Sequence, residues 1–315
     1  WDDAGTLPDY LVLRKRYRSS RPVATWNPMT GPFGVGPRGE VWYDAAAWPD
    51  PALAPVLSDA AFRLGETRVA PLAARGSDRL FLRVRQGRRA AVFVRYGCQR
   101  EENQRYGGHA RLLHEAGLSV PRVLAESREA RALLLEDVGE RNLLDHVVSC
   151  PADAERLYRK TLDQVVLLHT KATCLARSRG LEMDPAFDRR LYDWERDLFL
   201  NQIVRKRHAA GDSIPEAVID EYGVVAETLL LGGGTVIVHR DLQSTNVMLR
   251  GGRLSLIDFQ GMRYGAAAYD LASLLCDPYA KMPPDLRARL LEYYAGRMGD
   301  GGVRRLFPFG AVQRL

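Results

Sequence analysis

The stretch VIVHRDLQSTNVMLRGGRLSLIDFQG (residues 236–261) decides the fold that we predict for this chain. An apolar run at residues 236–238 leads into a polar cluster that contains Asp241 and Asn246. A Gly-Gly turn and a second apolar run follow, and Asp258 comes directly after them. Two short strands joined by this turn would bring the three polar side chains to one end of a hairpin.

These three side chains suit phosphoryl transfer. Mg²⁺ prefers hard oxygen ligands and keeps several of its waters, and Asn246 and Asp258 can supply such oxygens. Asp241 can then accept the proton of an attacking hydroxyl group and orient that group in line. We therefore predict a metal–phosphate site with Asp241 as the catalytic base and Asn246 and Asp258 as metal ligands.

The order of these motifs resembles the aminoglycoside phosphotransferase/choline kinase family, which has the protein-kinase-like fold. That family shows H-x-D-x-x-x-x-N followed by I-D-[FWY], and the chain has His239–Asn246 followed by Ile257–Phe259. The resemblance covers roughly residues 70–315. It implies an α+β, bilobal fold with a small antiparallel-sheet N-lobe and a larger, mainly helical C-lobe, and it implies ATP and Mg²⁺ as cofactors.

The same resemblance implies supporting roles for residues outside the hairpin. The segment LLLEDVG (133–139) resembles the link between the two lobes, where backbone groups at Glu136 and Asp137 would meet the adenine. Asp270 resembles the buried aspartate that braces the catalytic loop. We expect His239 to support the loop rather than act as an acid or base.

The small lobe departs from the family pattern. Most kinases of this fold hold the α- and β-phosphates with a strand lysine, but no lysine occurs between Lys15 and Lys160. Arg95 occupies the expected place, and Glu102 or its neighbour Glu101 opens the following helix. Arg95 could grip phosphate, or it could be a solvated strand residue. The phosphate loop is also sparse, and we expect Gly76 and Ser77 to supply its backbone contacts.

The acceptor site is expected in the segment before the catalytic loop. Residues 187–208 predict a helix with a buried stripe, for which we propose Leu191, Trp194, Leu198 and Ile203. The side chains that could receive the substrate are Gln243, Trp194, Glu195 and Asp197. The alternative is a charged, solvated helix face with Trp194 in the core.

Three parts of the chain are predicted. Residues 1–58 contain a Gly- and Pro-rich linker, and residues 1–17 resemble the final segment of a sugar nucleotidyltransferase. Residues 59–137 form the N-lobe and residues 138–315 the C-lobe. Because the chain begins at Trp1 and stops on an apolar, helix-like pattern, we expect both ends to be truncated, with a nucleotidyltransferase fused to or paired with this protein.

Within the superfamily, the motifs are most similar to bacterial kinases that phosphorylate free N-acetylmuramate or N-acetylglucosamine on the anomeric hydroxyl in cell-wall recycling. A sugar-1-phosphate is also what a nucleotidyltransferase consumes, so the two resemblances agree. The alternatives are an aminoglycoside or choline-type kinase, and a non-catalytic nucleotide-binding module.

The composition argues against nucleic-acid binding and against a membrane span. The net charge is +6, from 45 basic and 39 acidic residues, and no basic block suggests binding to nucleic acid. No apolar run of about 18 residues occurs, so we expect no membrane span. The four cysteines are widely spaced, which predicts reduced thiols in a cytoplasmic protein.

Overall fold

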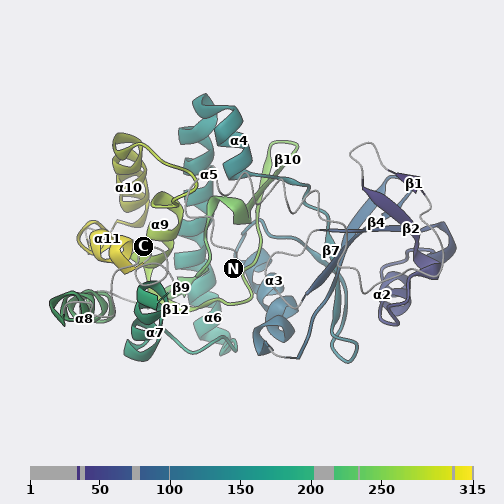
Figure 1. Cartoon of the computed structure of the whole chain (residues 1–315), viewed down its shortest axis with the longest axis horizontal. Coiled ribbons are helices and arrows are strands. Elements are labelled where there is room, and N and C mark those ends of the chain that lie inside the picture. The colour runs from purple at the N-terminus through teal and green to yellow at the C-terminus, as the bar shows by residue number, and fades with distance from the viewer. Residues whose placement is uncertain are drawn as a thin grey trace. The chain divides into compact units, whose positions relative to one another are not determined.

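The computed structural model describes residues 34–35, 40–72, 79–98, 100–201, 216–232, 235–299 and 302–313. The chain divides into two compact units (Figure 1). The first unit comprises Trp1–Arg111 with Val120–Gly139, and the second comprises Leu112–Ser119 with Glu140–Leu315. Each unit is described by itself below.

Unit 1 is built on an antiparallel sheet of order β1-β2-β3-β4-β5-β7-β6. Its strands are β1 (Gly34–Val35), β2 (Val41–Asp44), β3 (Arg68–Pro71), β4 (Leu80–Gln86), β5 (Arg89–Arg95), β6 (Val123–Ser127) and β7 (Ala132–Glu136). Its helices are α2 (Leu53–Asp59), the first turns of α3 (Tyr106–Glu115), and 3₁₀ turns at Ala45–Ala47, Leu64–Glu66 and Glu101–Arg105. Alternation of apolar and polar residues around the turn at Gly87 predicts the β4–β5 hairpin, and the register confirms it.

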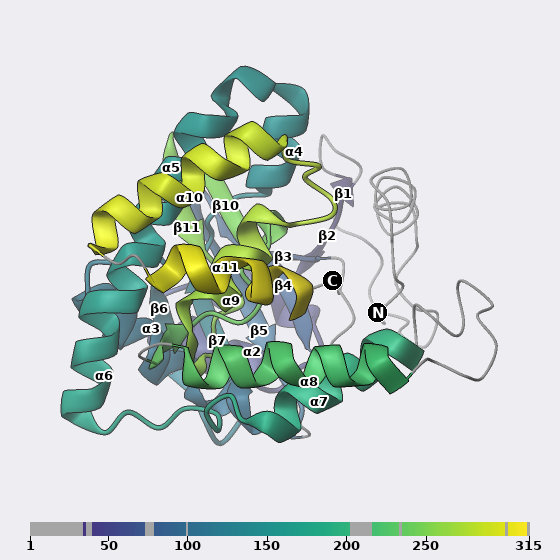
Figure 2. The same cartoon turned by 90° about the vertical axis from the view of Figure 1, so that its left-hand side faces the viewer.

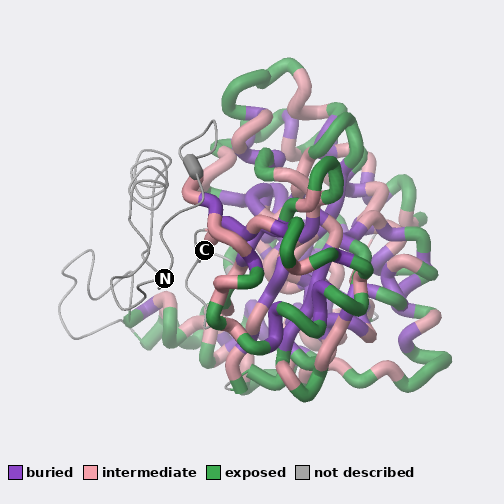
Figure 3. Tube along the Cα trace, turned by 90° about the vertical axis from the view of Figure 1, so that its right-hand side faces the viewer, coloured by how far each residue is buried: buried purple, intermediate pink, exposed green. Residues whose placement is uncertain are grey.

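Residues before position 59 take part in this unit. Strand β2 pairs with β3, and α2 buries Leu53, Val56 and Leu57 in the same apolar cluster as Phe93 and Leu134. The spacing of the three α2 side chains places them on one helix face, which explains why the helix lies on the sheet. The buried stretches are purple in Figure 3. Within the described residues, the sheet and its core therefore extend across the boundary that composition suggests near residue 58. Residues 1–17 lie outside the described ranges.

Unit 2 is mainly helical. Its helices are α4 (Leu143–Ser149), α5 (Ala154–Leu167), α6 (Thr173–Arg179), α7 (Arg189–Phe199), α8 (Glu216–Leu231), α9 (Ala267–Leu275), α10 (Pro284–Met298) and α11 (Gly302–Gln313). A π-helical turn, Leu168–Ala172, joins α5 to α6 without a break. Figure 2 shows α10 running beside α5, and α11 lying against α9 and α8. Local signals set several ends: Asp188 caps α7 by accepting a hydrogen bond from the backbone of Leu191, and Gly299 ends α10 with φ +64°.

Two small antiparallel sheets complete unit 2. Their strands are β8 (Arg141–Asn142), β9 (Thr235–Val238), β10 (Val247–Arg250), β11 (Arg253–Leu256) and β12 (Arg263–Ala266). One sheet has the order β11-β10-β8, and the other pairs β12 with β9. The predicted α+β class, with a sheet-rich region followed by a helical one, is confirmed. No helix in the described ranges is both long and apolar enough to cross a membrane.

Candidate active site

The β10–β11 hairpin brings Asn246 and Asp258 to the same end. Its register pairs Val247 with Leu256 at one end and Arg250 with Arg253 at the other. Asn246 directly precedes β10, and its carbonyl accepts a hydrogen bond of 3.0 Å from the backbone of Ile257. Asp258 follows Ile257, so the ladder itself sets the two candidate ligands side by side, as the spacing around the Gly-Gly turn predicts.

Asp241 is tied to Asn246 through the backbone. The Asn246 Nδ2 donates to the Asp241 carbonyl at 2.8 Å, and the backbone of Gln243 donates to the same carbonyl at 2.9 Å. The Asn246 amide group therefore has its donor turned toward the loop and its Oδ1 available as an acceptor. Asp241, Gln243 and Asn246 are all half-buried.

Two residues of this site have a strained backbone. Five described residues other than glycine have positive φ, and two of them are Arg240 at +78° and Asp258 at +66°. Such conformations cost of order 1–3 kcal/mol each and persist only where the surroundings impose them. The residues that flank Asp241 and carry the candidate metal carboxylate are thus held by tertiary contacts.

Asp270 supplies the first of these contacts. This fully buried side chain on α9 accepts hydrogen bonds from the backbone N–H groups of His239, at 2.8 Å, and Arg240, at 3.1 Å. His169, on the π turn, lies 3.1 Å from the same carboxylate through Nε2 and 2.6 Å from the hydroxyl of Tyr294 through Nδ1. With Nε2 donating to the carboxylate, a neutral His169 has Nδ1 left to accept from Tyr294.

Asp277 supplies a second contact, to the 3₁₀ turn Ser244–Asn246. Its Oδ2 accepts from the Ser244 backbone at 2.9 Å, and Tyr158 is hydrogen-bonded to the Ser244 hydroxyl at 2.8 Å. Burial raises the pKa of Asp277, against the opposing effect of the Ser244 and Tyr279 backbone N–H groups. Burial also raises the pKa of the Tyr158 hydroxyl, so this group stays protonated.

His239 is buried, with 1% of its surface exposed, and neither ring nitrogen has a hydrogen-bond partner among the described residues. The structure connects His239 to the site through its backbone, which Asp270 holds. This placement suits a supporting role.

The donor set fits a Mg²⁺ ion that is shared with a phosphate. Within the part of the chain that the structure describes, no group of three or more His, Cys, Asp or Glu side chains is placed to hold a metal. Asp258 and Asn246 offer one carboxylate and one amide oxygen, which is too few for an all-protein cage. Mg²⁺ commonly takes only one or two protein ligands and completes its shell with substrate phosphates and water.

The proposed stripe on α7 is wrong in part. Trp194 is 53% exposed and Leu198 is 44% exposed, so neither is buried. The buried face carries Tyr192 instead, because this ring stacks on Phe187 at a centroid distance of 5.0 Å. Trp194 is therefore not in the core either. Ile203 lies outside the described ranges.

Three acidic side chains near α7 have hydrogen-bond or ion-pair partners. Glu195 accepts a hydrogen bond of 2.7 Å from the hydroxyl of the buried Tyr269, and Asp197 lies 2.9 Å from Arg196. A further ion pair, largely buried, joins Asp184 to Arg263 on β12 at 2.9 Å. Glu195 is thus linked to the residue that precedes Asp270, while Asp197 and Asp184 are each paired with an arginine.

In unit 1, Arg95 is the last residue of β5. Its Nε lies 3.5 Å from a carboxylate oxygen of Asp50, and its Nη1 is buried with no hydrogen-bond partner in the described ranges. Glu102 lies 3.7 Å from Arg100, while Glu101 pairs with Arg105 at 3.6 Å.

The segment that follows β7 is fixed by side chains that sequence analysis did not pair. The Arg83 Nε lies 3.1 Å from Asp137 Oδ2, with both side chains less than 10% exposed. Asp137 Oδ1 accepts from the Gly139 backbone at 2.8 Å. Glu136 is bonded to Arg122 through both its backbone N–H and its side chain. Gly76 and Ser77 lie outside the described ranges.

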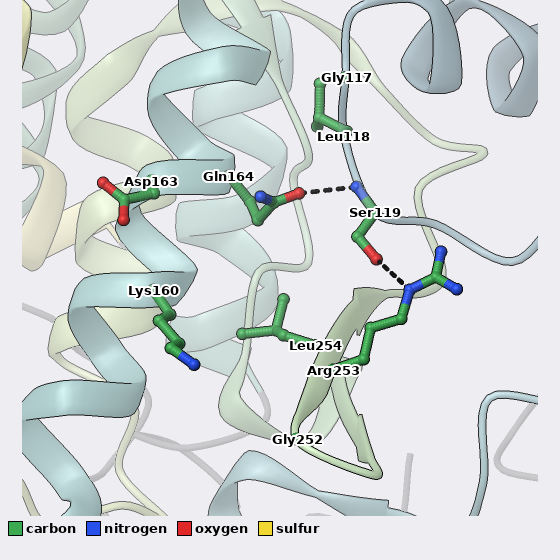
Figure 4. Close-up of a pocket in the computed structure, with 9 residues that line it drawn as sticks. All are labelled: Gly117, Leu118, Ser119, Lys160, Asp163, Gln164, Gly252, Arg253 and Leu254. Atoms are coloured by element: carbon green, nitrogen blue, oxygen red, sulfur yellow. Dashed lines mark hydrogen bonds between the residues drawn. The ribbon is translucent and has the colours of Figure 1, made fainter.

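A separate pocket of about 440 Å³ lies at the turn end of the β10–β11 hairpin, opposite to Asn246 and Asp258 (Figure 4). It is lined by Gly117, Leu118, Ser119, Lys160, Asp163, Gln164, Gly252, Arg253 and Leu254. Gln164 accepts from the Ser119 backbone at 2.7 Å, and Arg253 donates to the Ser119 hydroxyl at 3.3 Å. This pocket contains none of the candidate site residues.

Sequence reasoning missed His169, Tyr294, Asp277 and Gln260. Two signals could have indicated the first and third. His169 is a polar residue inside the apolar helical run VVLLH, and Asp277 lies two residues after helix α9, whose residues 268–275 are all buried. A polar residue in such a place needs a specific partner.

Comparisons with known proteins place the chain among phosphotransferases. The phosphotransferase enzyme family matches residues 68–307. The N-acetylmuramate/N-acetylglucosamine kinase of Pseudomonas aeruginosa is 29% identical over 228 residues, which are 71% of this chain and 64% of that protein. The kinase of the same name from Pseudomonas putida is 28% identical over 245 residues, covering 75% of this chain and 68% of that one.

Solved structures agree on the fold. Aminoglycoside 2′-phosphotransferase-IIIa in its GDP complex has a TM-score of 0.59 at 14% identity, covering 85% of this chain and 89% of that chain. The ethanolamine kinase of Plasmodium vivax has a TM-score of 0.55 at 15% identity, covering 79% and 74%. These likenesses confirm the predicted protein-kinase-like fold.

Proposed function

Because the chain belongs to the phosphotransferase enzyme family, we propose that it transfers the γ-phosphoryl group of ATP to the anomeric hydroxyl of a free amino sugar. N-acetylmuramate and N-acetylglucosamine are the proposed acceptors, and Mg²⁺ is the proposed metal. The family match supports a kinase that phosphorylates a small molecule. The identity of that acceptor and the use of Mg²⁺ are proposed.

The observation that most supports the proposal is that Asn246 and Asp258 lie at one end of the β10–β11 hairpin, where Asn246 also holds Asp241. Asp241 would accept the proton of the acceptor hydroxyl, and its backbone carbonyl is already held by Asn246 at 2.8 Å. Asn246 Oδ1 and the Asp258 carboxylate would hold Mg²⁺, which when bound neutralises charge on the phosphates. The bracing by Asp270 and Asp277 suits a reaction whose catalysis is mainly positioning.

The identity of the acceptor is supported by two observations. Two relatives at 28–29% identity are named for N-acetylmuramate and N-acetylglucosamine, although the match spans only 64% of the first. Acids near α7 are paired, as Asp197 is with Arg196 and Asp184 with Arg263. A polycationic aminoglycoside would need unpaired acids, so this balance favours a neutral or anionic sugar. We propose Gln243, Trp194, Glu195 and Asp197 as its contacts.

Nucleotide binding is proposed for unit 1. Arg95 keeps a buried, unpartnered Nη1 within the described ranges and would donate to a phosphate in place of the missing lysine. Glu102 would orient it, Gly76 and Ser77 would supply loop N–H groups, and Glu136 and Asp137 would lie at the adenine. Asp50, which lies beside Arg95, would hold the guanidinium while Arg95 binds the phosphate.

The cellular setting follows from the proposed chemistry. An anomeric sugar phosphate is a substrate for nucleotidyl transfer, so we propose that a sugar nucleotidyltransferase is fused to or paired with this protein. A cytoplasmic location is proposed because the reaction consumes ATP and the four cysteines are free thiols.

The test is a mass-spectrometric screen of ATP-dependent phosphorylation over free sugars, aminoglycosides and choline, with and without Mg²⁺. We expect a single phosphate on the two N-acetylated amino sugars, placed by NMR on the anomeric oxygen. Phosphorylation of an aminoglycoside or choline alone would replace the proposed acceptor. ATP binding with no transfer to any compound would replace the enzyme by a nucleotide-binding module.

A further inference from the structure

Gln260 lies two residues after the candidate metal ligand Asp258 and folds back onto it. A tight turn, closed by a 3.1 Å hydrogen bond from the Met262 backbone to the Phe259 carbonyl, reverses the chain here. The Gln260 Nε2 then donates to Asp258 Oδ1 at 2.8 Å. Gln260 is only 4% exposed, and Phe259 beside it is fully buried, so the surrounding side chains hold the Gln260 amide in one position.

The other end of the same amide has no partner. Gln260 Oε1 is buried and makes no hydrogen bond within the described part of the chain. Burying an amide oxygen without a donor is costly, and such groups in proteins usually mark a site for water, an ion or a ligand. A methionine would fill nearly the same volume without this cost. The carboxamide chemistry at position 260 therefore needs an explanation beyond packing.

The charge of the donor points to the explanation. Gln260 is neutral, so its bond orients the Asp258 carboxylate without placing a positive charge beside it. An arginine or lysine in this place would compete with a cation. A carboxylate accepts at about four positions, so the bond to Oδ1 does not by itself exclude a metal. Asp258 is also held at φ +66°, which fixes its backbone.

We infer that Gln260 is a positioning residue for the metal centre. Its Nε2 fixes the rotation of the Asp258 carboxylate, and its Oε1 accepts a hydrogen bond from a water that Mg²⁺ retains. Mg²⁺ gives up its waters reluctantly, and those waters are good donors. Groups that hold metal ligands in this way change metal affinity by about 10–100-fold when they are removed. The inference rests on the proposed function, because it takes Asp258 as a metal ligand.

The test measures metal binding directly. Mn²⁺, observed by electron paramagnetic resonance, is titrated into the full chain with a non-hydrolysable ATP analogue. Gln260→Met and Gln260→Leu remove both hydrogen-bonding ends at similar volume, and their melting temperatures report folding. The matched control is Gln164→Met, because Gln164 is a half-buried glutamine of unit 2 whose side chain accepts from the Ser119 backbone.

We expect both Gln260 variants to bind Mn²⁺ about 10-fold more weakly or worse. The Gln164 control should bind it as the wild type does. Asp258→Asn distinguishes a failure of the role inferred for Gln260 from a failure of the metal role proposed for Asp258. If Asp258→Asn weakens Mn²⁺ binding and the folded Gln260 variants do not, the inference is overturned and the proposed function stands. If Asp258→Asn leaves Mn²⁺ binding unchanged, the metal assignment fails and the inference fails with it.

Discussion

Asp270 accepts a 2.8 Å hydrogen bond from the backbone N–H of His239, which ties helix α9 to the loop that carries Asp241. The same carboxylate also holds Arg240, whose φ of +78° is strained. The loop conformation is therefore imposed by a side chain that lies 12 residues after the proposed metal ligand Asp258 in the sequence. Positioning of Asp241 depends on contacts made deep in unit 2.

Asp270→Asn should weaken both folding and turnover. Asparagine has one acceptor oxygen, so at least one of the three donors facing residue 270 loses its partner. We expect the free energy of unfolding to fall by about 1–3 kcal/mol. The value of kcat should fall at least about 10-fold, because small displacements of catalytic groups are expensive. Urea denaturation and steady-state turnover measure the two effects.

The control for that variant is Asp163→Asn on α5, where the acid is partly exposed and bonds to the Tyr293 hydroxyl. Its stability and kcat should stay close to those of the wild type. Equal effects of the two substitutions would contradict the special role of Asp270.

Tyr294 and Tyr293 offer a comparison between neighbours on α10. The Tyr294 hydroxyl bonds to His169 inside the core, whereas the Tyr293 hydroxyl bonds to Asp163 near the surface. Tyr294→Phe leaves a buried imidazole nitrogen unpaired and should cost about 1–3 kcal/mol of stability. Tyr293→Phe should cost less than about 1 kcal/mol. Thermal or urea unfolding of both variants measures the two losses of stability. A larger loss of stability in Tyr293→Phe than in Tyr294→Phe would show that the buried hydrogen bond to His169 is not important.

Asp277 predicts a particular pH dependence. Burial raises its pKa in the folded state, so the folded protein holds this proton more tightly than the unfolded chain does. The stabilising contribution is complete below the unfolded pKa of about 3.9 and is lost as pH rises through the folded value. Asp277→Asn cannot titrate. The stability of the wild type relative to this variant should therefore fall as pH rises from about 4, and urea titrations at several pH values should show it. A relative stability that increases with pH would be the wrong sign.

The Arg83–Asp137 pair predicts strong coupling in unit 1. Both side chains are nearly buried, and burial lowers the pKa of Arg83 while Asp137 opposes that shift. Removing one partner takes the nearest opposite charge away from a buried charge, so Arg83→Met or Asp137→Ala should each cost about 3–5 kcal/mol. The double variant should cost much less than the sum. A double-mutant cycle by urea unfolding measures this.

The exposed pair Arg122–Glu136 is the control for that cycle, since Arg122 is 66% exposed. Its coupling should not exceed about 1 kcal/mol. Additive losses at Arg83 and Asp137 would show that the two charges do not depend on each other.

The fold could be predicted because the deciding features are local. The hairpin around Gly251 and Gly252 follows from alternating residues and a turn dipeptide, and its register sets Asn246 beside Ile257. Apolar spacing predicts a helix over residues 101–118, and the structure has a 3₁₀ turn at Glu101–Arg105 followed by α3 at Tyr106–Glu115, with Tyr106, Ala110 and Leu113 buried. Such patterns depend on the period of one element and need no knowledge of its neighbours.

The remaining features could not be predicted because they join distant parts of the chain. Arg83 and Asp137 are far apart in the sequence, and only the sheet brings them together. On α7 the sequence offers two apolar faces, and the ring of Phe187 selects the one that carries Tyr192. Trp194 is left exposed as a result. The bond from Gln260 to Asp258 depends on the positive φ of Asp258, which no sequence pattern indicates.

We propose that Asp241 is the base of a phosphoryl transfer to a sugar hydroxyl. The most direct measurement is single-turnover transfer from ATP to N-acetylmuramate and N-acetylglucosamine by the wild type and Asp241→Asn, with nucleotide affinity measured alongside. We expect the variant to bind ATP with unchanged affinity and to transfer phosphate about 100-fold more slowly or worse. Equal transfer rates in the two proteins would contradict it.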